Sequence, residues 1–253
     1  FFILLLLTVG GFAMVGASNV FNQIFEKDLD KLMARTKNRP LPDERMQTKT
    51  AMLIGVILTL IGIFSLYLIN IKTAFFASVS TFLYTCLYTP LKQKTPLSVF
   101  VGAFPGAIPF MLGWVAATNE FGIEPGVLFM LQFFWQFPHF WAIGWLMHDQ
   151  YKKAGFKMLP SGEKDQSTAF QIVFYTFWTI LISIVPALEF TGRLYISNYA
   201  LIFVLIFGII FLYYAFRLMV LKSDFEAKLL LRVSIIYITC IQIIYVLDKI
   251  LFQ

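Results

Sequence analysis

Apolar segments long enough to cross a lipid bilayer occupy most of the 253-residue chain. A membrane-spanning helix needs roughly 20 mainly apolar residues. Eight segments of about this length, the third of them short, are predicted at residues 1–20, 50–70, 74–89, 97–118, 125–147, 168–188, 197–220 and 230–252. Because backbone polar groups in lipid must find partners within the protein, the sequence predicts an all-α, polytopic helical bundle in a membrane.

Composition and chain start agree with an integral membrane protein. Hydrophobic residues make up 59% of the chain and charged residues 13%, against roughly 25% charged residues in soluble domains. The first apolar run has no basic region before it, so we interpret it as a span rather than a signal peptide, and we expect the N-terminus to be truncated. Cys86 and Cys240 fall within predicted spans, which argues against a disulfide framework.

The distribution of basic residues predicts the orientation in the membrane. Of the 20 Lys and Arg residues, 17 fall in four alternate connections, at residues 22–49, 90–96, 148–167 and 217–232. Connections rich in Lys and Arg stay on the cytoplasmic side, so both chain ends are expected outside. We therefore interpret the net charge of +6 as a signal for orientation in the membrane. The expected partner is the lipid bilayer, and no nucleic acid is expected.

A charged stretch, NQIFEKDLDKLMARTKNRP at residues 22–40, follows the first span. On a helix, Asn22, Glu26 and Asp30 share one face, and Asp28 points roughly the other way. Carboxylates one turn apart repel unless a cation lies between them, and proteins usually hold Mg²⁺ with one or two carboxylates plus substrate phosphates. The bases that follow suit phosphates. The alternative is a salt-bridged helix end that carries orientation signals.

Two further spans carry unusual residues. Gln132, Gln136 and His139 form a polar stripe along the fifth span, and polar groups at membrane depth face the bundle interior. The stripe favours a polar cavity, although a lone intramembrane histidine is more often a hydrogen-bonded core residue. The fourth span contains GAFPGAIPFMLGW, whose glycines and prolines suit either a cavity wall or close helix packing.

Two more polar groups are predicted at the cytoplasmic edge. Tyr88 and Lys92 lie four residues apart where the third span ends. Lys92 could bind a phosphate or could simply follow the distribution of basic residues described above. After the fifth span, the segment HDQYKKAGFKMLP again brings acidic and basic residues to the membrane edge.

In order along the chain, these motifs resemble those of the UbiA-type intramembrane prenyltransferases. NxxxExDxDxxMxRTxxRPLP at residues 22–42 is similar to the first aspartate-rich motif of that family, and RTKNRP is similar to its heme O synthase, or protoheme IX farnesyltransferase, branch. PHFWAIGWLMHDQYKKAGFKMLP at residues 138–160 resembles the second signature of that branch. YTPLKQKTP and GAFPGAIPFMLGW also occur where the family has a basic loop and a Gly/Pro-rich helix.

The resemblance implies one membrane-embedded prenyltransferase domain over residues 1–253, in a nine-helix family bundle of which this chain would lack the first helix. It implies Mg²⁺-assisted ionisation of farnesyl diphosphate and attack on the allylic cation by a vinyl group of heme b, with water completing the hydroxyethylfarnesyl side chain of heme O. A bacterial-type plasma membrane is expected rather than the mitochondrial inner membrane, with the active-site loops cytoplasmic. A downstream heme-modifying enzyme or terminal oxidase assembly factors would be further partners.

The resemblance also assigns residues to roles, because metal ions and cationic side chains neutralise the charge on a leaving diphosphate. The catalytic set is Asn22, Glu26, Asp30, Asp149 and His139. The expected metal ligands are Glu26, Asp28, Asp30 and Asp149. Arg35, Arg39, Tyr88, Lys92 and Tyr151 are assigned to the diphosphate. His139 is expected to contact heme, through a propionate or near the reacting vinyl group.

Some residues depart from the family pattern. Glu26 stands where the family usually has Asp, Met147 and His148 replace a basic pair, and Ser161 and Gly162 replace two valines. Two alternative functions stay open. A prenyltransferase for a quinone precursor or another aromatic acceptor would use the same metal site. A transporter would use the Gly/Pro-rich span and the polar stripe as a midplane site, but the acidic residues cluster at one membrane face, which favours an enzyme.

Overall fold

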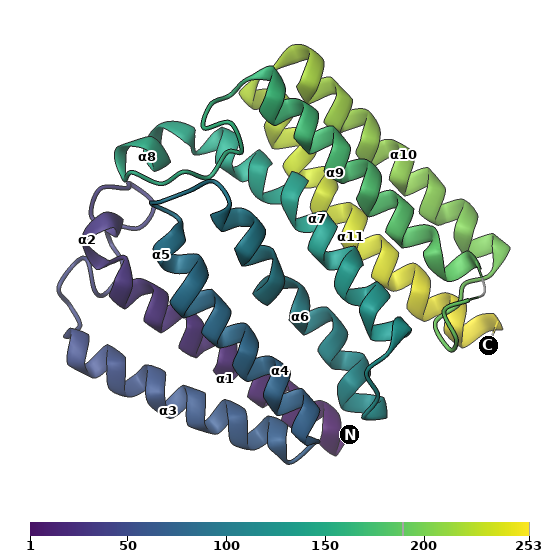
Figure 1. Cartoon of the computed structure of the whole chain (residues 1–253), viewed down its shortest axis with the longest axis horizontal. Coiled ribbons are helices and arrows are strands. Elements are labelled where there is room, and N and C mark those ends of the chain that lie inside the picture. Colours follow the sequence, from purple (N-terminus) through teal and green to yellow (C-terminus); the bar gives the residue numbers. More distant parts are fainter. Residues whose placement is uncertain (189, 253) are drawn as a thin grey trace. The chain divides into compact units, whose positions relative to one another are not determined.

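The computed structural model describes residues 1–188 and 190–252, and all regular structure within these ranges is helical (Figure 1). Seven helical segments are long and apolar enough to cross a membrane: α1 (Phe2–Phe25), α3 (Thr48–Tyr67), Ile71–Leu91, α6 (Ser98–Thr118), Gln166–Leu188, α10 (Asn198–Leu221) and α11 (Asp224–Phe252). The predicted all-α membrane bundle is thereby confirmed.

The eighth predicted span corresponds to α7 (Ile123–Leu146), which has 24 residues. At 1.5 Å per residue it is about 36 Å long, enough to cross the hydrocarbon core. It is not among the seven segments that are both long and apolar enough to cross a membrane. The count of eight spans therefore stays a prediction.

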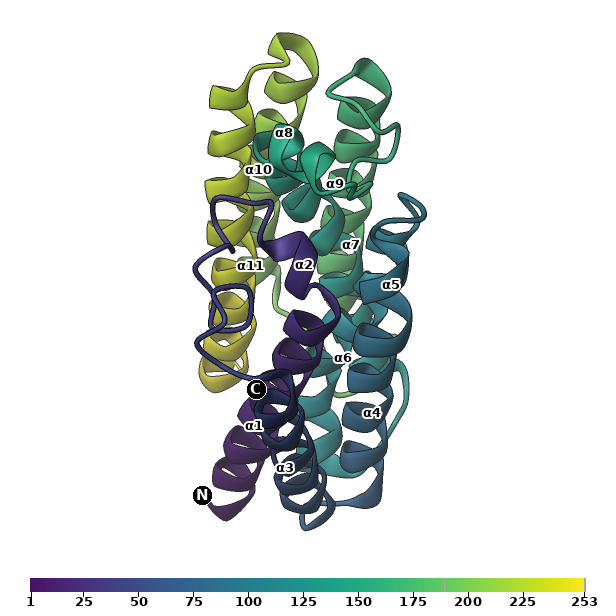
Figure 2. The same cartoon turned by 90° about the vertical axis from the view of Figure 1, so that its left-hand side faces the viewer.

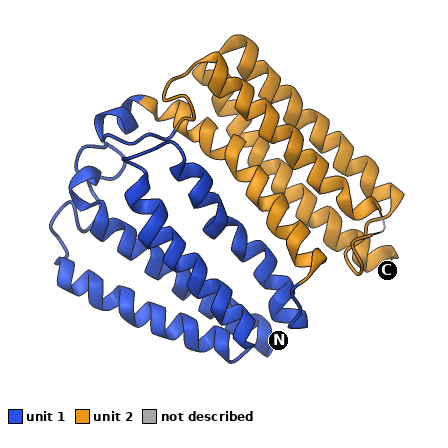
Figure 3. Cartoon of the chain, viewed as in Figure 1, with its two compact units in different colours: residues 1–121, 149–158 blue, residues 122–148, 159–253 orange. Residues whose placement is uncertain are grey.

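The described chain forms two compact units (Figure 3). Unit 1 comprises residues 1–121 and 149–158. In it, α1 packs along α3, while α4 (Ile71–Phe82) packs against α3 and α6 (Figures 1 and 2). Small residues permit the approach of α1 to α3, since a Cβ atom added at Gly10 would lie 2.6 Å from the side chain of Leu66. Such close contacts between small residues are typical of helix packing in membranes.

The third span of unit 1 is not a regular α-helix. A π-helix, η1 (Leu83–Tyr88), joins α4 to the short helix α5 (Thr89–Leu91). The Thr89 hydroxyl donates a hydrogen bond of 2.9 Å to the carbonyl of Tyr84. A π-turn adds a residue to a helical turn and often occurs at functional sites. It changes the direction in which the residues after it project, Lys92 among them.

Unit 2 comprises residues 122–148, 159–188 and 190–252 of the described chain. It contains α7, α9 (Gln166–Ile184), a 3₁₀ turn η2 (Val185–Leu188), α10 and α11. Each of the four long helices packs against the next, and α11 packs back on α7, so they close into an antiparallel four-helix bundle (Figure 1). Its core is apolar, with side chains such as Ile172, Phe211, Leu230 and Ile241 fully buried. The helix α8 (His148–Lys153) begins where the two units meet in the sequence.

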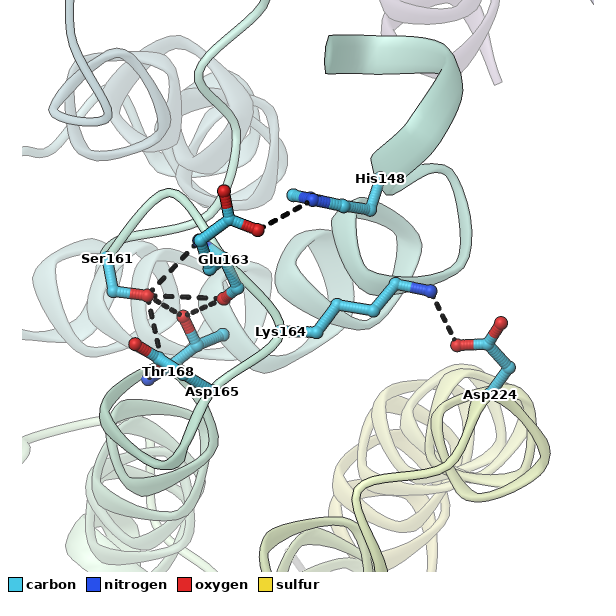
Figure 4. A network of polar contacts seen from close by, with 7 residues as sticks. All are labelled: His148, Ser161, Glu163, Lys164, Asp165, Thr168 and Asp224. Atoms are coloured by element: carbon cyan, nitrogen blue, oxygen red, sulfur yellow. Dashed lines mark hydrogen bonds and ion pairs between the residues drawn. The ribbon is translucent and has the colours of Figure 1, made fainter.

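A polar network fixes the loop that leads into α9 (Figure 4). The Asp165 carboxylate caps α9 by accepting a hydrogen bond of 2.8 Å from the backbone N–H of Thr168. This hydrogen bond holds the pKa of Asp165 below its usual value. The neighbouring residues also bridge outward, Glu163 to His148 at 3.1 Å and Lys164 to Asp224 at 2.7 Å. These contacts join the loop to His148 and to the start of α11.

Candidate functional site

The predicted ladder of polar side chains lies at the end of α1 in unit 1. The α-helix ends at Phe25, and α2 (Lys27–Asp30) begins just after Glu26. The one-turn spacing survives this break, because Glu26 N–H bonds to the Asn22 carbonyl at 2.9 Å and Asp30 N–H to the Glu26 carbonyl at 2.8 Å. Asn22, Glu26 and Asp30 are only 6%, 5% and 1% exposed. Asp28 is exposed to solvent, as its position on the other side of the helix predicts.

Each ladder residue contacts a polar group from another part of unit 1. Lys92 Nζ lies 2.9 Å from Glu26 Oε1, and both side chains are nearly buried. Arg39 donates to Asp30 Oδ2 at 2.8 Å. Tertiary structure thus brings together the end of α1, the connection that follows α2 and the end of the third span.

The neutral member of the ladder is positioned differently. The Asn22 side-chain amide donates to the hydroxyl of Thr89 at 3.1 Å. Because the Thr89 hydroxyl donates its own proton to the Tyr84 carbonyl, it is fixed as an acceptor for Asn22. Thr89 is 3% exposed and was not among the predicted site residues. Nothing in the sequence distinguishes it from other threonines in the spans.

Two carboxylate oxygens at this site lack hydrogen-bond partners within the described part of the chain. Asp30 Oδ1 is buried without a partner, and Glu26 Oε1, although it is paired in charge with Lys92, receives no well-directed hydrogen bond. A buried acceptor without a partner costs about 1 to 3 kcal/mol. Hard oxygen atoms of this kind are the ligands that Mg²⁺ prefers. The buried pair Glu26 and Asp30 therefore fits a magnesium ion.

The four predicted metal ligands do not form a metal site by themselves. Among the described residues, no three Asp, Glu, His or Cys side chains are grouped closely enough to hold a metal ion. Asp28 and Asp149 are exposed, unlike Glu26 and Asp30. Since Mg²⁺ is usually bound through one or two carboxylates together with phosphates of a substrate, two buried carboxylates are sufficient on the protein side. The wider set stays a prediction.

Two of the residues predicted to bind diphosphate lie near Lys92: Tyr88 directly, and Tyr151 through Phe156. The Lys92 ammonium group lies 4.5 Å from the centre of the Tyr88 ring and 5.9 Å from that of Phe156. Phe156 also packs edge-on against Tyr151 at 6.0 Å. The segment is tied to Lys92 by the backbone N–H of Lys157, which donates to the Lys92 carbonyl at 2.8 Å. Phe156 was missed from sequence because an aromatic residue in an aromatic-rich chain carries no distinct signal.

Gly102 on α6 determines where the Tyr88 ring can lie. A Cβ atom at Gly102 would be 2.6 Å from the ring. For this glycine, close packing is the role that the structure supports. Arg35, also predicted to bind diphosphate, is exposed and has no hydrogen bond or ion pair among the described residues.

His139 belongs to unit 2, whereas the ladder belongs to unit 1. Its Nδ1 lies 2.9 Å from the hydroxyl of Ser234 on α11. Its ring stacks on Trp135 with centroids 4.5 Å apart. Gln132 and Gln136, the other members of the stripe, are 8% and 2% exposed and face into the protein, whereas His139 is half-buried. Ser234 lies 95 residues from His139 along the chain, and no sequence pattern links the two.

Fold and site together define a polytopic α-helical membrane protein with buried acid–base pairs at the end of a span. The chain belongs to the UbiA prenyltransferase family, whose profile matches residues 1–236. A protein of Flavobacterium psychrophilum named protoheme IX farnesyltransferase is 60% identical over 250 residues, which cover 99% of this chain and 83% of that protein. A protein of the same name from Christiangramia forsetii is 59% identical over 244 residues, covering 96% of this chain and 81% of that protein.

Solved structures show the same fold at much lower identity. A digeranylgeranylglyceryl phosphate synthase superposes with a TM-score of 0.79 at 19% identity, covering 96% of this chain and 84% of the other. A UbiA homolog from Archaeoglobus fulgidus bound to DMAPP and Mg²⁺ gives a TM-score of 0.66 at 13% identity, covering 97% and 88%. The profile and the two relatives confirm the predicted family, and the solved structures confirm its fold.

Proposed function

We propose that this chain transfers a farnesyl group from farnesyl diphosphate to a vinyl group of heme b, giving heme O, and that it does so with Mg²⁺. Support comes from relatives named protoheme IX farnesyltransferase that are up to 60% identical over nearly the whole chain. The structural observation that carries the proposal is the buried pair of carboxylates, Glu26 and Asp30, each beside a basic side chain. In this proposal the carboxylates hold the metal and the basic side chains hold the diphosphate.

The side chains at this site can stabilise diphosphate as a leaving group. When the allylic C–O bond breaks, its electron pair goes to the diphosphate, and the charge must be neutralised for the step to be fast. Mg²⁺, when bound, supplies Lewis-acid stabilisation of that charge. Lys92 and Arg39 supply further positive charge, and the Tyr88 and Tyr151 hydroxyls would orient the phosphate oxygens. The vinyl carbon then attacks the farnesyl cation, and water adds to the resulting heme-borne cation with loss of a proton.

The two ion pairs fit the state of the site before substrate binds. Glu26 with Lys92, and Asp30 with Arg39, each pair a proposed metal ligand with a proposed phosphate ligand. A magnesium diphosphate offers positive charge to the carboxylates and negative charge to the bases. Its binding would therefore replace two internal pairs without leaving a buried charge unpaired, which would otherwise be strongly destabilising. In this proposal Asp149, from the segment that packs with Lys92, joins the metal site once phosphate is bound.

The distribution of basic residues supports a further part of the proposal. The connections that carry Glu26, Lys92 and Asp149 would lie on the cytoplasmic side of a bacterial plasma membrane. Farnesyl diphosphate would then reach the site from the cytoplasm, with its apolar chain in the bilayer.

Incubating the purified protein with heme b and farnesyl diphosphate tests the proposal. Mass spectrometry of the extracted pigments should find heme O with Mg²⁺ and none after chelation by EDTA, with recovery on adding Mg²⁺ back. A parallel incubation with an aromatic quinone precursor in place of heme b tests the rival acceptor class. Prenylation of that acceptor, with no heme O formed, would overturn the proposal.

A further inference from the structure

The imidazole of His139 is held on two sides within unit 2. Trp135 stacks on the ring face, with an interplanar angle of 22°. Ser234 contacts the Nδ1 edge at 2.9 Å. The same two neighbours are bonded to each other, because the Trp135 indole N–H donates to the Ser234 carbonyl at 2.7 Å. The ring orientation is therefore fixed by α7 and α11 together.

Hydrogen bonds at Ser234 determine which imidazole nitrogen carries the proton. The Ser234 hydroxyl donates to the carbonyl of Leu231 at 2.7 Å. A hydroxyl has one proton, so Ser234 can only accept from His139, and Nδ1 must be the donor. A charged imidazolium is costly within an apolar helix, so the ring is neutral. In the neutral ring with Nδ1 protonated, Nε2 carries a free lone pair.

That lone pair is available. Nε2 of His139 has no hydrogen-bond partner among the described residues, and the side chain is only half-buried. A fixed ring, a protonated Nδ1 bound to an acceptor and an unpartnered Nε2 are the features of histidines that ligate metals. The same geometry does not suit a carboxylate, because Nε2 in this tautomer has no proton to donate.

We propose that His139 Nε2 is an axial ligand to the iron of the porphyrin substrate. The proposal rests on the proposed function for the identity of that substrate. Neutral imidazole is a common axial ligand of heme iron. The vinyl group lies at the edge of the macrocycle, so ligation at the central iron holds the porphyrin while leaving the reacting edge accessible. His139 is thus a substrate-positioning residue, and of the two predicted heme contacts, the propionate is disfavoured.

Comparing heme b with metal-free protoporphyrin IX isolates the iron contact. Both have the same vinyl and propionate groups, so only the binding of heme b should depend on His139. We expect His139→Ala to weaken heme binding at least about 10-fold, the scale seen when metal-site geometry is lost, and to leave protoporphyrin IX binding unchanged by fluorescence titration. Electron paramagnetic resonance of the bound ferric heme should show an imidazole ligand in the parent protein and none in the variant.

The chain offers a matched control, because it contains only two histidines, His139 and His148. His148→Ala should keep the imidazole signature. Ser234→Ala removes the Nδ1 acceptor and should weaken heme binding by about 10-fold while retaining the signature. It also provides a second variant if His139→Ala does not fold.

Two results would overturn the ligand assignment: an imidazole-free spectrum in the parent protein, or equal weakening of heme and protoporphyrin IX by His139→Ala. These outcomes are separate from failure of the proposed function. A parent protein that makes heme O without an iron–imidazole bond would refute only the ligation. A protein that binds heme through imidazole and never forms heme O would refute the transferase proposal.

Discussion

The end of α1 in unit 1 and the stripe along α7 in unit 2 bury polar groups of different kinds. At the end of α1 in unit 1 the buried groups are charged and paired, Glu26 with Lys92 and Asp30 with Arg39. Along α7 in unit 2 they are neutral, and His139 is held by a hydroxyl and an indole. Unit 2 has an ion pair of its own, Arg217 with Glu226 at 2.6 Å, but at the ends of α10 and α11.

Under the proposed function, this difference would correspond to two chemical tasks. Departure of a diphosphate requires opposite charges that can exchange partners with metal and phosphate. Holding a largely apolar acceptor requires shape and one well-placed lone pair, because an unpaired charge would be costly there. Charge substitutions in unit 1 should therefore affect the diphosphate, and substitutions along α7 should affect the acceptor.

The largest effect is expected for Asp30→Asn, which removes a carboxylate charge while keeping the side-chain shape. Heme O formation per folded molecule should fall by about 10²- to 10³-fold, the range found when one transition-state contact is lost. Asp43→Asn is the matched control, since Asp43 is exposed in the same connection and pairs with Arg45. Near-normal turnover by well-folded Asp30→Asn would break the link between buried charge and diphosphate chemistry.

The second prediction concerns the Glu26 and Lys92 pair. Lys92→Met should raise the KM for farnesyl diphosphate about 10-fold, as one charged contact is lost, and should lower stability by about 3 kcal/mol, because Glu26 is left buried and unpaired. Lys94→Met, at an exposed lysine nearby, is the control.

The double variant Glu26→Gln with Lys92→Met should regain stability in thermal unfolding but not activity. Recovery of both would mean that the pair is only structural. At Glu26 itself, Asp should be milder than Ala, because the carboxylate is retained. An equal loss in both would show that side-chain reach is decisive.

Gly102→Ala should have a smaller effect, through the Tyr88 ring. Its new Cβ would lie 2.6 Å from that ring, so the ring must move away from Lys92, at a cost of about 1 to 3 kcal/mol in stability. The KM for farnesyl diphosphate should rise, with heme affinity unchanged. Gly113→Ala on the same helix meets no atom within 4 Å and should be neutral or slightly stabilising. A changed heme affinity in Gly102→Ala would contradict the assignment of separate tasks.

The smallest effect is expected at Asp165, which caps α9 in unit 2. Asp165→Ala should reduce stability by about 1 kcal/mol with activity per folded molecule unchanged, and Asp165→Asn should lose less because Asn also caps helices. The pKa of Asp165 is lowered in the folded state. Its stabilisation is therefore complete above the unfolded pKa of about 3.9 and is lost as pH falls through the lower folded value. Thermal unfolding from pH 7 to pH 3 should show the difference between Asp165→Ala and the parent shrinking, and a constant difference would contradict the cap.

The spans could be predicted because bilayer thickness fixes helix length and lipid excludes unpaired backbone groups. The predicted segment 74–89 was shorter than the observed span Ile71–Leu91, which begins with α4 at Ile71 and continues through α5 to Leu91. The sequence did not predict the π-helix at Leu83–Tyr88 within this span. A π-turn depends on packing and on hydrogen bonds such as that of Thr89 with Tyr84, which leave no periodic signal in a sequence.

The sequence by itself determined the membrane class, the family and the face of the helix that carries Asn22, Glu26 and Asp30, because those features follow from apolar length, motif spacing and the 3.6-residue period. Only the tertiary structure decided that Lys92 and Arg39 are the partners of the carboxylates, and that Ser234 fixes the proton on His139. The physical reason is that a helical period specifies which side chains share a face, whereas hydrogen bonds and ion pairs act over about 3 Å between segments many residues apart.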